Sequence, residues 1–86
     1  MNKNLGINIS KPSDTQLKTL FELYQTKQYF NAEKLSLFLT KEFPKHEFAW
    51  KALSAILKQT GRYNEALVAC KKSVDLKPDN AEAHYN

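Results

Sequence analysis

Two consecutive segments in the second half of the chain carry apolar residues at the spacing of an amphipathic helix. Apolar side chains fall at positions 49, 50, 53, 56 and 57, and again at positions 63, 66, 67, 70 and 74. Both sets follow the i, i+3, i+4, i+7 rule that gathers side chains on one helix face. Gly61 lies between them, where a helix end commonly needs a left-handed residue that glycine adopts without strain. The pattern predicts two antiparallel helices joined at Gly61 and closed by Pro78.

The first half shows a similar pattern after residues 1–12, which we interpret as a flexible or loosely docked tail. Ser13 and Gln16 have the spacing of a capping box, in which two side chains bond backbone N–H groups at a helix start. The apolar stripe of this helix consists of Leu17, Leu20, Phe21 and Tyr24. A second helix is expected to stop before Pro44, because proline disfavours a helical residue ahead of it. Its apolar residues are Ala32, Leu35, Phe38 and Leu39.

The two halves are related by an internal repeat. The second helices superpose when the chain is shifted by 34 positions, as from Tyr29 to Tyr63, from Ala32 to Ala66 and from Pro44 to Pro78. The first helices align better at a shift of 33 positions, which places Trp50, Leu53 and Leu57 on Leu17, Leu20 and Tyr24. We therefore expect the first repeat to lack one residue near its inter-helix turn, where Lys27 stands in the place of Gly61.

The segment from Trp50 to Pro78 resembles the tetratricopeptide repeat (TPR), whose 34-residue pattern is W-x2-L-G-x2-Y…A-x3-F…P. Trp50, Leu53, Ala66 and Pro78 match this pattern, whereas Leu57 and Cys70 stand for its aromatic residues and Ser54 for its glycine. Over both repeats the signature positions are Tyr29, Ala32, Pro44, Trp50, Leu53, Leu57, Gly61, Tyr63, Ala66, Cys70 and Pro78. The resemblance implies an all-α fold, an α–α superhelix built from helix–turn–helix repeats.

This interpretation divides the chain into four parts. Residues 1–12 are the tail, residues 13–45 form a degenerate first hairpin with a capping role, and residues 46–80 form a TPR repeat. Residues 81–86 begin a further, truncated repeat, because the same shift of 34 positions leads from Glu47 to Ala81 and from Ala49 to Ala83. Since so short a segment cannot cover the preceding helix, we expect that helix to keep an apolar face open. The chain should then either be marginally stable or self-associate through this face.

Composition and candidate chemistry exclude several classes of protein. A single cysteine, Cys70, rules out an internal disulfide framework and fits a cytoplasmic location. On the apolar stripe of its helix, it is expected to be a buried, inert thiol. The net charge of +4 is spread along the chain, so that nucleic acid is a disfavoured partner, and no apolar run is long enough for a membrane span. His46 and Glu47 begin an HExxH zinc motif that fails at Trp50, so we expect no metal, no cofactor and no catalysis.

The resemblance to TPR proteins also implies a site, because the first helix of each repeat in that family lines a concave groove for peptides. The candidate groove residues are Lys18, Glu22, Gln25, Lys51, Ala52, Ala55, Lys58, Gln59 and Asn86. The expected function is a protein–protein interaction scaffold. Two alternatives remain open: a non-catalytic N-terminal arm of a larger enzyme resembling O-GlcNAc transferases, and an RNA-binding helical repeat.

Overall fold

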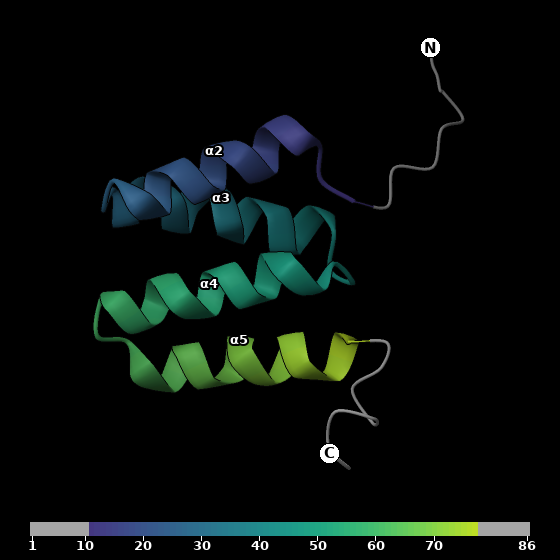
Figure 1. Cartoon of the computed structure of the whole chain (residues 1–86). Coiled ribbons are helices and arrows are strands. Elements are labelled where there is room, and N and C mark those ends of the chain that lie inside the picture. The colour runs from purple at the N-terminus through teal and green to yellow at the C-terminus, as the bar shows by residue number, and fades with distance from the viewer. Residues whose placement is uncertain (1–10, 78–86) are drawn as a thin grey trace, which may run out of the picture.

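The computed structural model describes residues 11–77, which form four α-helices and no strand within that range (Figure 1). The helices are α2 (Asp14–Gln25), α3 (Tyr29–Glu42), α4 (Glu47–Gln59) and α5 (Tyr63–Leu76). Each helix packs against the next one in the chain, so that the α2–α3 and α4–α5 hairpins lie side by side. The all-α architecture of stacked hairpins is confirmed. The expectations for Pro78 and residues 81–86 lie outside the described residues.

Local sequence signals define the ends of the first two helices. Ser13 caps α2: its hydroxyl accepts from the Gln16 N–H at 3.0 Å, and the Gln16 side chain accepts from the Ser13 N–H at 2.9 Å. This reciprocal pair confirms the predicted capping box. Helix α3 ends at Glu42, two positions before Pro44, as the steric restriction ahead of proline predicts.

The two inter-helix turns have the same backbone geometry. Lys27 adopts a φ of 63° and Gly61 a φ of 81°, both in the left-handed region. The N–H of Gln28 donates to the carbonyl of Leu23 at 2.9 Å, and the N–H of Arg62 donates to the carbonyl of Leu57 at 2.9 Å. Each pair of equivalent residues is 34 positions apart, so the turn of the first repeat has as many residues as the turn of the second.

The missing residue belongs at the start of α2, which corrects the expectation of a shortened turn. The C-caps Thr26 and Thr60 are 34 positions apart, whereas the N-caps Ser13 and His46 are 33 positions apart. Accordingly α2 has 12 residues and α4 has 13. The 34-position register therefore holds from the body of the first helix onward, and the comparison of residues between repeats must use it.

Two apolar clusters hold the helices together. The first lies among α2, α3 and α4 and contains the buried residues Leu20, Ala32, Leu39, Ala49 and Ile56. The second lies between α4 and α5 and contains Leu53, Leu57, Ala66 and Ala69, with Trp50 packed against it. The Trp50 indole N–H also donates to the Pro44 carbonyl at 2.8 Å. Trp50 therefore contributes to the core through its ring and to the α3–α4 connection through its indole N–H.

Helix α5 buries a different face from the one that its large apolar residues indicate. Ala66, Ala69 and Ser73 are its buried residues, whereas Tyr63 and Leu67 are exposed, at 62% and 67%. Small side chains face α4 because they permit close approach, and the Ser54 hydroxyl donates to the Ala66 carbonyl at 3.0 Å across that contact. We call the exposed set Tyr63, Leu67 and Cys70 the open flank of α5.

The expectation of a buried thiol at Cys70 is wrong, because this cysteine is exposed. The equivalent positions of the first repeat, 34 residues earlier, show why Cys70 is exposed. Its counterpart in α3 is Ser36, which is fully buried, and the counterpart of Leu67 is Glu33, whose side chain is 15% exposed. Helix α3 packs against both α2 and α4, whereas the main packing partner of α5 within residues 11–77 is α4. Phe38 is likewise 47% exposed rather than part of the α3 stripe.

Candidate protein-interaction surface

A hollow of about 200 Å³ opens between the first helices of the two hairpins. We call it the inner hollow; it is lined by Leu20, Phe21 and Tyr24 of α2 and by Phe48, Lys51, Ala52, Ala55 and Ile56 of α4. The lining is apolar apart from the lysine. Phe21 is 53% exposed and Phe48 is 39% exposed, so two aromatic rings from different helices offer apolar surface to solvent.

The shape of the inner hollow follows from the side chains on α4. Leu20 and Ile56 are fully buried, whereas Ala52 and Ala55 on α4 are too short to fill the space between the helices. In the 34-position register Ala55 is the counterpart of Phe21. A bulky ring on one helix therefore corresponds to a small residue on the other, and this difference leaves the hollow open.

One wall of the inner hollow is fixed by contacts of Tyr24. Its ring packs edge-on against Tyr29, with centroids 5.8 Å apart and an interplanar angle of 64°. Its hydroxyl oxygen accepts a hydrogen bond from the Gln59 amide at 3.4 Å. Because these partners come from α3 and α4, the α2 wall is tied to both hairpins through contacts that need no ligand.

The structure distributes the candidate groove residues over different surfaces. Lys51, Ala52 and Ala55 line the inner hollow, and Gln59 contacts its wall through Tyr24. Lys58 instead lines a separate hollow beside the open flank, together with Ser54. The three exposed candidates on α2 line neither of these hollows; they are Lys18, Glu22 and Gln25. Asn86 lies outside the described residues.

Three aromatic residues of the inner hollow are absent from the sequence-based candidates: Phe21, Tyr24 and Phe48. The shift of 33 positions explains the omission of Phe21 and Tyr24, because it pairs Ala55 with Glu22 and Lys58 with Gln25. Phe48 lies on α4 and was omitted independently of this shift. A signal in the sequence points to the correct register, since the dipeptide Gln25-Thr26 recurs as Gln59-Thr60 at a shift of 34 positions. With that register, Phe21 and Tyr24 would have been assigned to the inner face of α2.

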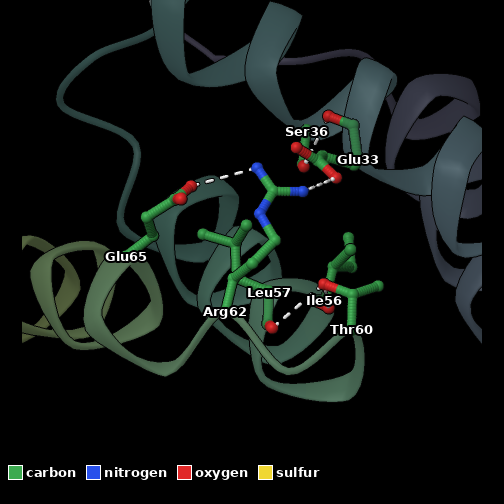
Figure 2. A network of polar contacts seen from close by, with 7 residues as sticks. All are labelled: Glu33, Ser36, Ile56, Leu57, Thr60, Arg62 and Glu65. Atoms are coloured by element: carbon green, nitrogen blue, oxygen red, sulfur yellow. Dashed lines mark hydrogen bonds and ion pairs between the residues drawn. The ribbon is translucent and has the colours of Figure 1, made fainter.

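An ion-pair network joins the two hairpins away from the inner hollow (Figure 2). One terminal nitrogen of Arg62 donates to Glu33 at 2.6 Å and the other donates to Glu65 at 3.0 Å. The hydrogen bond to Glu33, and then that to Glu65, raises the pKa of Arg62, because both carboxylates favour the charged guanidinium. Because these three charges are paired within the fold, the network is a structural tie between α3 and the turn that precedes α5.

Other chemistry is sparse in the part of the chain that the structure describes. Residues 11–77 contain no cluster of three or more side chains of the kind that holds a metal ion. No helix in this range has the length and apolar character needed to cross a membrane. Within the same range, the inner hollow combines an apolar lining with the two exposed rings of Phe21 and Phe48.

Comparison with known proteins assigns these observations to a class. The fold is an all-α helical repeat built from stacked hairpins, an architecture typical of protein-interaction modules. A family model described as a TPR repeat matches residues 55–86, which supports assignment to the TPR family. The matched region contains the end of α4 and all of α5. No curated protein and no solved structure matches the chain.

Proposed function

We propose that the chain is a non-catalytic scaffold module that binds a segment of a partner protein in the inner hollow. The observation that carries the proposal is the pair of exposed rings, Phe21 and Phe48, which line an apolar hollow from different helices. The volume of the inner hollow, about 200 Å³, is below the range of about 300–1,000 Å³ typical of sites for drug-sized molecules. It suits one or two side chains of a peptide better than a cofactor or a metabolite.

The hydrophobic effect provides the driving force for this binding. Burial of apolar surface contributes about 25 cal/mol per Å². A Phe or Leu side chain moved from water into the hollow would gain up to about 1.5–3 kcal/mol before the costs of association. One such anchor gives weak binding, so a tightly binding partner must also contact neighbouring parts of the inner face.

A peptide-display selection on the immobilised chain tests the proposal. We expect the selected peptides not to bind the Ala55→Glu variant, because this substitution places a charged side chain in the inner hollow. The matched control is Asn31→Glu, which adds the same charge at an exposed position on α3 outside the hollows described above. Peptides that bind both variants as well as the unmodified chain would place the binding surface elsewhere and refute the proposal.

The arm of a larger enzyme resembling O-GlcNAc transferases is a second proposal for the same module. It rests on the likeness of residues 43–57 to repeat segments that precede glycosyltransferase domains. It also rests on Asn86, which matches one of the asparagines that follow the inner face of the repeat arm in O-GlcNAc transferases. Its equivalents Ala52 and Lys18 carry no amide, which weakens it. Transferase activity in the natural full-length protein, lost when residues 13–77 are deleted, would support it; a full-length protein without a transferase domain would refute it.

RNA binding is the least supported function. The chain has one arginine, Arg62, and that residue is occupied by Glu33 and Glu65. Phosphate contacts would make retention of RNA strongly dependent on salt. Failure of the chain to retain single-stranded RNA at low salt would dismiss this function. A cytoplasmic location remains part of the proposal, supported by the single cysteine.

A further inference from the structure

The charge at the inner hollow indicates which partner segment fits it. Lys51 is the one charged residue of the lining, and within residues 11–77 it forms no ion pair. The acidic residue one turn earlier, Glu47, would be its natural neighbour on the helix. Glu47 instead accepts a hydrogen bond from Ser73 of α5 at 2.8 Å. Among the described residues, therefore, no carboxylate pairs with the ammonium group at the hollow.

We propose that the inner hollow binds a protein segment that combines one bulky apolar side chain with a nearby Asp or Glu. This inference rests on the proposed function and names its partner. The apolar side chain occupies the space between Phe21 and Phe48, and the carboxylate pairs with Lys51 at the rim. The carboxylate belongs to an acidic side chain of the partner rather than to its chain terminus. Ala52 and Ala55 beside Lys51 offer no side-chain donor that could hold a terminal carboxylate.

Helix geometry sets the spacing between the two partner groups. Phe48 and Lys51 stand at positions i and i+3 of α4, which places their Cβ atoms about 5–6 Å apart on one helix face. In an extended peptide, side chains at i and i+2 project from the same side, about 6.5–7 Å apart. The partner sequence is therefore an acidic residue, any residue, then an apolar residue, or the same order reversed.

Three capped pentapeptides test the inference: glycine–aspartate–serine–phenylalanine–glycine, and its two variants with asparagine for aspartate or alanine for phenylalanine. Binding is followed from amide chemical shifts of residues 20–24 and 48–56 in the ¹⁵N-labelled chain. We expect the asparagine peptide to bind about two- to fivefold more weakly than the aspartate peptide at low salt, the range of an exposed ion pair. The alanine peptide should produce no saturable shift.

Matched variants separate the charge from the hollow. Lys51→Gln should abolish the difference between the aspartate and asparagine peptides while both still bind. Lys41→Gln, an exposed change on α3, should preserve that difference. Equal binding of the two peptides to the unmodified chain would overturn the acidic partner and leave the apolar hollow standing. Shifts confined to residues outside the hollow would overturn the inference, whereas the display selection decides the proposed function independently.

Discussion

The two left-handed turn residues allow a sharp test of the energetics of this fold. Lys27 has a φ of 63° and Gly61 a φ of 81° in turns of equal geometry. A residue with a Cβ costs about 1–2 kcal/mol in the left-handed region. A glycine at the same position avoids this strain, but its greater conformational freedom in the unfolded chain lowers stability by about 0.4–1 kcal/mol. Lys27→Gly should therefore stabilise the protein by about 0.5–1 kcal/mol.

The reciprocal change should destabilise the chain by a similar amount. A Cβ added at Gly61 meets no atom within 4 Å, so Gly61→Ala introduces backbone strain and no clash. For a domain of this size, about 1 kcal/mol shifts the unfolding temperature by about 4–8 °C. Thermal unfolding followed by circular dichroism should therefore show Lys27→Gly raising the midpoint by roughly 2–8 °C and Gly61→Ala lowering it comparably.

Lys27→Ala is the control, because it keeps the Cβ and removes only the exposed charge. Its midpoint should stay within the equivalent of about 0.5 kcal/mol of the unmodified chain, as surface changes usually do. If Lys27→Gly left the midpoint unchanged or lowered it, the strain assigned to this turn would be absent. Equal effects of Lys27→Gly and Lys27→Ala would attribute the change to charge instead.

Three further predictions concern the core and the open flank. Ile56→Ala removes a side chain that is 0% exposed and should cost about 2–5 kcal/mol in chemical denaturation; a smaller loss would show that the site collapses. Cys70 should react with a thiol reagent in the native chain at the rate of an exposed thiol, whereas reaction only after unfolding would contradict its exposure. If copies associate through the open flank, Leu67→Lys should shift the sedimentation of the chain toward monomer, and Phe30→Lys on α3 should not.

Sequence patterns were sufficient for features determined by local backbone chemistry. The capping box of Ser13, the stop before Pro44 and the left-handed residue at Gly61 each depend on a few neighbouring residues, and each is confirmed. The core positions Leu53 and Leu57 were also correct, because α4 is packed on both sides and its periodic stripe must be buried.

Features that depend on the neighbours of a helix could not be obtained in this way. The apolar stripe predicted a buried thiol at Cys70, but the structure exposes this residue and buries Ala69 and Ser73, where small side chains meet α4. Leu67 is exposed, in agreement with the apolar face that this helix was expected to keep open. The list of groove residues predicted from the sequence was also incomplete, because an alignment error of one position between the repeats turns a helix by about 100°. That error replaced Phe21 with Glu22 as the counterpart of Ala55.

The tie between Arg62 and Glu33 has a consequence for cooperativity (Figure 2). In a stacked-hairpin protein, contacts between neighbouring hairpins determine whether the repeats unfold together or one by one. Arg62 sits in the turn of the second hairpin and bonds a carboxylate of the first, so loosening of that turn also disturbs α3. The exposed part of this coupling weakens as ionic strength rises. Added salt should therefore weaken this one contribution to coupling, whereas the apolar cluster shared by α2, α3 and α4 continues to join the two hairpins.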